Sequence, residues 1–354
     1  MERLPDYLKR LNFGSTVHFF NELDICIHRK QNHFNIIKCS TGETTKLDLK
    51  HTCQFMACNK ANKLFFVRRT HGKPPHIKLN KSFDNDKIKS YLHFYVYDLK
   101  SDTYKKSKPF CQLTPSSDMS SFHLNDDNII CICSNGDVLT VNIDTLDVEV
   151  SMRLRNYIEL EGRLFSYRPW YRVDNNSYTT IVNRQRYWYK TSSYFDGFSD
   201  EIDYLYVKID VIDKTHKCIP GKGTLYETSV YLEDSRVWVH QRSSNTNMMN
   251  VTSSLYDIKK GDEVIWQFEI PHRASDVMLN GWECRNIFNF SETLFVICFN
   301  KMIYLCNLQD LTLKSIFFNT GMHDVFYDKE KGYIIPIYNL GTTENMITLD
   351  DFMS

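Results

Sequence analysis

Residues 121–152 read SFHLNDDNIICICSNGDVLTVNIDTLDVEVSM and contain four short apolar runs separated by turn-forming residues. The turn signals are Asn125-Asp126-Asp127-Asn128, Asn135-Gly136-Asp137 and Asp144-Thr145-Leu146-Asp147. An Asn-Gly pair between apolar runs is a strong signal for a β-hairpin. The stretch therefore predicts four antiparallel strands joined by tight turns.

The same pattern recurs along the chain. Residues 286–318 again show four runs and three short turns, and residues 16–49 repeat the pattern as TVHFF, DICIHR, FNIIKCS and TKLDL. A polar residue followed by a short polar turn closes each third run. This marker begins at Lys38, Asp98, Asn142, Asp210, Asp257 and Asn307, with a seventh candidate at Asp351. A period of about 45–50 residues with four strands per unit is typical of a β-propeller.

The last unit has three apolar runs, at 324–328, 333–338 and 346–350, and lacks its outermost strand. A spare segment at 8–13 precedes the first complete unit, so we expect an N-terminal strand to complete the last unit. Such closure would remove a bare sheet edge. The alternative is a short helix at 5–11, because Pro5 suits a helix start.

This organisation resembles the WD40/kelch type of β-propeller, although the Gly-His and Trp-Asp pairs of WD40 repeats and the Gly-Gly pairs of kelch repeats are missing. We therefore expect an all-β fold of about seven four-stranded blades in a single domain over residues 1–354. Two intervals between markers are long and predict insertions near 71–90 and 184–200. The resemblance implies non-catalytic protein binding, because loops on rigid scaffolds usually carry recognition.

Composition agrees with this fold and limits the function. The 354 residues include 44 Phe and Tyr but only three Ala, which disfavours a helical or a disordered chain. Lys and Arg number 43 against 43 Asp and Glu, which disfavours a dominant attraction to nucleic acid or membrane. The start has no apolar run typical of a signal peptide, and the 11 Cys have no metal-ligand spacing. We expect an intracellular protein, cytoplasmic or nuclear, with reduced cysteines and no cofactor or metal.

Two segments stand out as candidate binding surfaces. The insertion at 68–89 carries seven Lys or Arg and two acids, and its Pro and Gly residues indicate a loop. The segment 153–190 is rich in Arg, Tyr and Trp, which are enriched in interface hot spots. The alternatives are a solvated hairpin extension for the first segment and packing between blades for the aromatic residues of the second. The predicted partner-binding residues are Arg68, Arg69, Lys73, Arg168, Trp170, Arg172, Arg184, Arg186, Tyr187 and Trp188.

Three functions remain open from the sequence. The first is a protein-interaction scaffold, a subunit of an intracellular complex. The second is an RNA- or DNA-associated propeller that uses the same basic segments. The third is a hydrolytic or glycan-processing enzyme with a site at the central channel, whose residues would come from several blades and show no motif in the sequence. We predict no catalytic residue, because no catalytic motif occurs.

Overall fold

Strands form most of the described part of the chain in this computed structural model. The structure describes residues 2–3, 17–20, 24–29, 33–47, 55–59, 63–71, 90–112, 119–125, 128–133, 136–154, 169–184, 203–221, 228–243, 253–271, 284, 286–318, 321–328, 332–338 and 345–353. The chain divides into two compact units. Unit 1 is Met1–Asp48 with Thr224–Ser354, and unit 2 is Leu49–Gly223.

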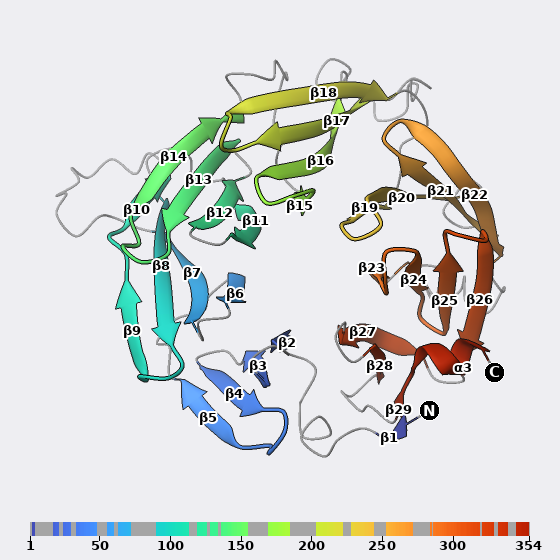
Figure 1. Cartoon of the computed structure of the whole chain (residues 1–354), viewed down its shortest axis with the longest axis horizontal. Coiled ribbons are helices and arrows are strands. Elements are labelled where there is room, and N and C mark those ends of the chain that lie inside the picture. The colour runs from blue at the N-terminus through green and yellow to red at the C-terminus, as the bar shows by residue number, and fades with distance from the viewer. Residues whose placement is uncertain are drawn as a thin grey trace, which may run out of the picture. The chain divides into compact units, whose positions relative to one another are not determined.

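Unit 2 contains three antiparallel sheets that follow the order of the chain (Figure 1). The first comprises β6 (Phe55–Asn59), β7 (Lys63–His71), β8 (Ser90–Asp98), β9 (Thr103–Lys106) and β10 (Phe110–Gln112). The second comprises β11 (Met119–Leu124), β12 (Asn128–Cys133), β13 (Asp137–Asn142) and β14 (Val148–Arg153). The third comprises β15 (Tyr171–Arg172), β16 (Ser177–Arg184), β17 (Asp203–Asp210) and β18 (Thr215–Gly221).

The first of these sheets has a divided fourth strand. β9 pairs with the second half of β8, and β10 pairs with its first half. Ser107 lies between the two pieces, and its hydroxyl accepts the backbone N–H of Phe94 at 3.0 Å. Pro109 has no N–H to donate, which suits a break in the strand. β9 and β10 therefore act together as one outer strand.

Unit 1 contains three complete sheets. The first comprises β2 (Val17–Phe20), β3 (Ile25–Arg29), β4 (Phe34–Lys38) and β5 (Thr44–Leu47). The second comprises β19 (Thr228–Leu232), β20 (Val237–Ser243), β21 (Ser253–Lys260) and β22 (Glu263–Pro271). The third comprises β23 (Asn286–Asn289), β24 (Leu294–Cys298), β25 (Met302–Asn307) and β26 (Thr312–Phe317).

A last sheet in unit 1 is completed by the N-terminal strand. β27 (Met322–Asp328) pairs with β28 (Tyr333–Tyr338), and a bridge between Ile334 and Ile347 joins β28 to the stretch that follows β29 (Asn345–Met346). β29 in turn pairs with β1 (Glu2–Arg3). The predicted closure by an N-terminal strand is thus confirmed, and the closing strand in the described part of the chain is β1. A strand with two paired residues is too short for apolar alternation, so no pattern in the sequence indicates it. Residues 8–13, and the alternative helix at 5–11, lie outside the described residues.

Over the described residues, these seven sheets are the blades of an all-β propeller, and the predicted fold class is confirmed. The stretches 16–49, 121–152 and 286–318 each form the four strands that their sequence predicts. Apolar alternation explains why they pair in this way, since successive side chains of a strand point to opposite faces of the sheet. No helix in the described ranges is both long and apolar enough to span a membrane.

Apolar clusters between consecutive sheets hold each unit together. In unit 2, one cluster includes Phe65 and Phe94 of the first sheet with Leu139 of the second. Another joins Ile132 of the second sheet to Tyr178 of the third. In unit 1, comparable clusters connect the sheets β19–β22, β23–β26 and the last sheet. Burial at about 25 cal/mol per Å² of apolar surface makes these clusters the main stabilising contribution to the fold.

The marker residues of the sequence begin a recurring turn between the third and fourth strands. Asp98 Oδ1 accepts the backbone N–H groups of Lys100 and Ser101, at 2.8 and 3.1 Å. Asn142 and Asp210 make the same pair of bonds in the next two sheets. Four residues after each marker the backbone is left-handed, with φ between 54° and 73°. These positions are Gly42, Asp102, Leu146, Lys214, Gly261 and Leu311. At Asp98, Asn142 and Asp210 the marker is therefore an Asx-turn, and at all six markers a left-handed residue follows in the turn.

Substitutions at two equivalent positions of this turn should change the free energy of unfolding in opposite directions. Gly261→Ala should lower the free energy of unfolding by about 1 kcal/mol, because an L-residue at φ +66° is strained although its Cβ would meet nothing within 4 Å. Lys214→Gly, at an exposed position with φ 54°, should have no destabilising effect or stabilise by up to about 1 kcal/mol. Urea denaturation of both variants measures this. Equal effects at the two positions would contradict the turn assignment.

The seventh marker candidate, Asp351, is wrong. It lies in the short helix α3 (Leu349–Met353). Its carboxylate accepts hydrogen bonds from the backbone N–H and the hydroxyl of Thr348, at 2.8 and 3.1 Å. Thr348 precedes the helix as its N-cap, so the acid three residues later is a helix-start signal and not a turn marker.

The eight cysteines whose side chains the structure describes form no disulfide. Cys131 and Cys133 both belong to one apolar cluster in unit 2, as expected for alternate residues on one face of a strand. Burial raises the pKa of the Cys131 thiol, which disfavours the reactive thiolate. These cysteines serve as small apolar residues of the core.

Candidate functional site

The two predicted insertions occupy the same place in two sheets of unit 2. β7 ends at His71 and β8 begins at Ser90, so residues 72–89 join a second strand to a third. β16 ends at Arg184 and β17 begins at Asp203, so residues 185–202 make the same connection two sheets later. In an antiparallel meander, successive connections leave from alternate edges of the sheet. The two insertions therefore leave their sheets at corresponding edges.

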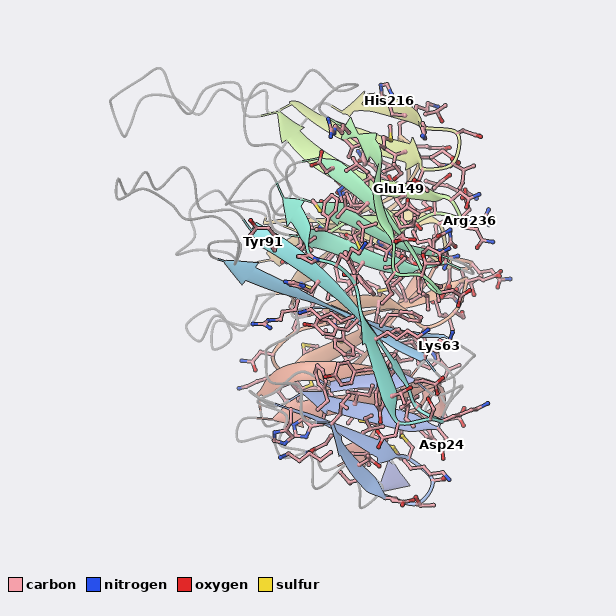
Figure 2. All side chains as sticks on the ribbon, turned by 90° about the vertical axis from the view of Figure 1, so that its left-hand side faces the viewer. Asp24, Lys63, Tyr91, Glu149, His216 and Arg236 are labelled. Atoms are coloured by element: carbon pink, nitrogen blue, oxygen red, sulfur yellow. The ribbon has the colours of Figure 1, made fainter. Side chains whose placement is uncertain are left out.

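Contacts between the three sheets of unit 2 show that corresponding edges of the sheets lie on the same side of the unit. Lys63, at the start of β7, lies 3.4 Å from Asp144 in the turn between β13 and β14. Asn125, in the first turn of the second sheet, donates its amide N–H to the backbone carbonyl of Asn175 in the first turn of the third. The first and third turns of all three sheets thus share one edge, the turn edge. The opposite edge, from which both insertions leave, is called the connection edge. Figure 2 labels Lys63 and Tyr91, which belong to these two edges, on opposite sides.

Five of the ten predicted binding residues fall in stretches that the structure does not describe. Lys73, Arg168, Arg186, Tyr187 and Trp188 lie outside the described residues. They fall in the stretches 72–89, 155–168 and 185–202, which join strand ends of that edge. Arg69 and Arg184 lie near the ends of β7 and β16, and only their backbone is described. The side chain of Arg68 is described and is partly buried.

Trp170 is a core residue of unit 2. Its side chain is 2% exposed and packs in the cluster that joins the second and third sheets. Its backbone N–H donates to the Ser121 hydroxyl at 2.6 Å, and its carbonyl accepts from Nε2 of His123 at 3.0 Å. This burial contradicts the predicted contact of Trp170 with a partner. The alternative, packing between blades, is what the structure shows.

Arg172 likewise connects the second and third sheets. Its Nη2 atom donates to the side-chain oxygens of Asn125 and Asn175, at 3.1 and 2.5 Å. Its Nε donates to the carbonyl of Asp174 at 3.2 Å. The guanidinium therefore satisfies turns within the protein, and the structure does not bring Arg172 together with the connection edge.

The sequence did not identify a cluster of basic and aromatic side chains on the first sheet of unit 2. Arg68 of β7 lies opposite His93 of β8, and Tyr95 of β8 lies opposite both Phe66 and Lys106 of β9. The rings of Phe66 and Tyr95 stack, with centroids 5.1 Å apart and planes 7° from parallel. Lys106 Nζ lies 5.7 Å from the centroid of the Tyr95 ring. Directly opposed residues share a face, so Arg68, His93 and Lys106 form one group, called here the basic cluster.

The electrostatics of the basic cluster are unfavourable for a protonated histidine. Burial lowers the pKa of His93, and the positive charges of Lys106 and Arg68 lower it further. Lys106 is exposed, while Arg68 and His93 are partly buried. The cluster therefore places two fixed positive charges beside a histidine on one face of the sheet.

A row of polar side chains crosses the sheet β19–β22 in unit 1. Strand register places His240 opposite both Ser229 and Asp257. His240 Nδ1 lies 3.0 Å from Ser229 Oγ, and Gln267 Nε2 donates to Asp257 Oδ1 at 2.8 Å. Serine, histidine and aspartate are the residue types of a nucleophile, its base and an orienting acid. His240 is 0% exposed, however, so a substrate cannot reach the row, and we assign it to holding the strands together.

No group of three or more His, Cys, Asp or Glu side chains in the described part of the chain could hold a metal ion.

Comparisons with known proteins support the fold. No protein family and no curated protein matches the sequence. Among solved structures, Sqt1 of Saccharomyces cerevisiae is similar with a TM-score of 0.53 and 8% identity, over 94% of this chain and 83% of that one. BBS1N, in a structure of its complex with ARL6DN, is similar with a TM-score of 0.51 and 9% identity, over 95% of this chain and 92% of that one. Both are propellers. At such low identity the likeness shows the fold alone.

Proposed function

We propose that the protein is a non-catalytic protein-interaction subunit of an intracellular complex, and that its partner binds at the connection edge of unit 2. The observation that carries this proposal is topological. The strands that flank the two insertions and the stretch 155–168 all end at one edge of unit 2. Of the residues singled out in the sequence analysis, these stretches contain Lys73, Arg168, Arg186, Tyr187 and Trp188. Loops gathered on a rigid sheet scaffold suit recognition. Arg, Tyr and Trp are the side chains most enriched in interface hot spots.

The expected result of removing two of these side chains is loss of the partner with the fold intact. Arg186→Ala combined with Trp188→Ala should reduce the partner recovered by affinity capture from cells by about tenfold or more, since hot-spot residues contribute about 2 kcal/mol or more each. Quantitative mass spectrometry of the captured proteins provides the measurement.

A matched control removes one cation and one aromatic ring elsewhere in unit 2. Lys217 is exposed on β18, and Tyr104 is 64% exposed on β9 near the turn edge. Lys217→Ala with Tyr104→Ala should leave partner recovery unchanged. The proposal fails if both double variants capture the partner as well as the unmodified chain does. It also fails if the Arg186/Trp188 variant is unfolded by circular dichroism, because those side chains would then belong to the core.

A nucleic acid is the alternative partner that one observation favours. Residues 68–89 carry seven Lys or Arg against two acids, and they belong to the same edge. Binding through such a segment would weaken steeply between 50 and 200 mM salt, by the release of counterions from phosphates. Fluorescence anisotropy with labelled RNA and DNA across this range separates the two functions. Tight, salt-sensitive binding would replace the protein partner by a nucleic acid.

A further inference from the structure

The function proposed above does not account for the charges of the basic cluster on β7, β8 and β9. Among the described residues, neither Arg68 nor Lys106 forms an ion pair with a carboxylate, and Lys106 Nζ lies over the Tyr95 ring. Arg68 is partly buried, so its charge has lost part of its hydration without gaining a carboxylate from the part of the chain that the structure describes. An unpaired cation in such a place costs free energy, and a bound anion would offset this cost.

Strand register places the three side chains on one face of the sheet. Arg68 and His93 are directly opposed across β7 and β8, which brings their Cβ atoms to about 5 Å. Lys106 is opposed to Tyr95, two residues beyond His93 on the same face of β8. The stacked Phe66 and Tyr95 rings form the floor beside them. Three strands therefore present three nitrogen donors above one aromatic surface.

We propose that Arg68, His93 and Lys106 form a binding site for a phosphate group, either free or as a monoester. A guanidinium offers a planar fork of N–H donors, and an ammonium offers a compact charge. A phosphate monoester carries close to two negative charges and three strong acceptor oxygens at neutral pH. A carboxylate has one charge and two oxygens, so it would leave one of the cations uncompensated. The lowered pKa of His93, which burial and then Lys106 and Arg68 produce, agrees with a site that lacks its anion.

The strand β9 supplies a matched pair of variants. Lys105 and Lys106 are adjacent and both exposed, but Lys105 is opposed to Val96 and therefore lies on the other face of the sheet. Lys105→Ala and Lys106→Ala remove the same charge from the same strand. Non-specific attraction of anions would change equally in both, whereas a site on the Tyr95 face would change only with Lys106.

Isothermal titration calorimetry of the intact chain, at constant ionic strength in chloride buffer, tests the site with inorganic phosphate and with O-phosphoserine as probes. We expect binding of at least one probe, about tenfold weaker binding in Lys106→Ala and in Arg68→Ala, and unchanged binding in Lys105→Ala. Preference for inorganic phosphate would identify free phosphate as the ligand class, and preference for O-phosphoserine would identify a phosphorylated side chain. Binding of neither probe, or equal weakening in Lys105→Ala and Lys106→Ala, would overturn the proposal. The site does not require the partner proposed above, so either proposal can fail alone.

Discussion

Trp170→Ala should lower the free energy of unfolding by about 3–5 kcal/mol, the usual cost of removing a buried tryptophan side chain. The ring is 2% exposed and lies in the cluster that joins the second and third sheets of unit 2. Alanine would leave a cavity between Ile132 and Tyr178 that the two sheets cannot close without moving. Urea denaturation followed by circular dichroism gives the difference.

Removal of an exposed aromatic ring serves as the control for the loss of the buried Trp170 ring. Tyr104→Ala removes a ring that is 64% exposed and should change the free energy of unfolding by less than about 0.5 kcal/mol. If Trp170→Ala were as stable as the unmodified chain and lost its partner, Trp170 would be a contact residue. The prediction from its sequence would then be right, and the burial described above would not hold in solution.

Acid should destabilise unit 2 through His123. Burial lowers the pKa of this histidine from 6.5 to about 4. The hydrogen bond to the Trp170 carbonyl opposes this shift, and the charge of Arg172 adds to it. Because a carbonyl only accepts, Nε2 of the neutral ring carries the hydrogen. The folded state therefore favours the neutral form, while the unfolded chain takes up a proton at higher pH.

The pH window follows from these two values. The contribution of His123 to the free energy of unfolding is fully present above pH 6.5. It is lost as the pH falls towards about 4, where the ring is protonated in both the folded and the unfolded state. The total loss should be about 2–3 kcal/mol, since each unit of pKa shift corresponds to about 1.4 kcal/mol and the ring is only partly buried.

His123→Gln keeps an N–H donor for the Trp170 carbonyl but cannot titrate. Its free energy of unfolding should fall less between pH 7.5 and pH 4.5 than that of the unmodified chain, while His216→Gln, at an exposed position, should behave as the unmodified chain does. Protonation of carboxylates affects all three proteins alike and cancels in the comparison. An identical pH dependence of His123→Gln and the unmodified chain would contradict the account of this histidine.

Local signals were sufficient to predict the blades. The stretch 121–152 combines apolar alternation with turn residues, and it forms β11, β12, β13 and β14 with the predicted turns. The markers at Asp98, Asn142 and Asp210 were visible because the same side-chain chemistry closes each third strand. These features depend on residues that are close in the sequence, which is why a single sequence reveals them.

Features that depend on distant pairing were missed or misplaced. The closing strand β1 has two paired residues, too few for a pattern. Trp170 and Arg172 lie in a segment whose composition is typical of a binding surface. Their hydrogen-bond partners, Ser121 and Asn125, lie some fifty residues earlier in the chain. These distant contacts give the two residues a role in holding the sheets together. The composition of a segment indicates which contacts its side chains can make and leaves open what they face.

The basic cluster illustrates the same limit. Arg68 appeared in the sequence as part of an exposed basic insertion, whereas His93 and Lys106 gave no signal. Their relation appears only when β8 is aligned with β7 and β9. Alternation within residues 90–98 and 103–106 shows which side chains of one strand share a face. It does not show which strands are neighbours or which residues lie opposite one another. Strand register, and not composition, carries this information.

Hydrogen–deuterium exchange of the chain with and without its captured partner tests the central claim most directly, because it maps the contact without mutation. The account predicts slower exchange with the partner bound in peptides covering 72–89, 155–168 and 185–202. It predicts unchanged exchange in the turns at 99–102, 143–147 and 211–214 of the turn edge. Protection confined to the turn edge, or to unit 1, would contradict binding at the connection edge.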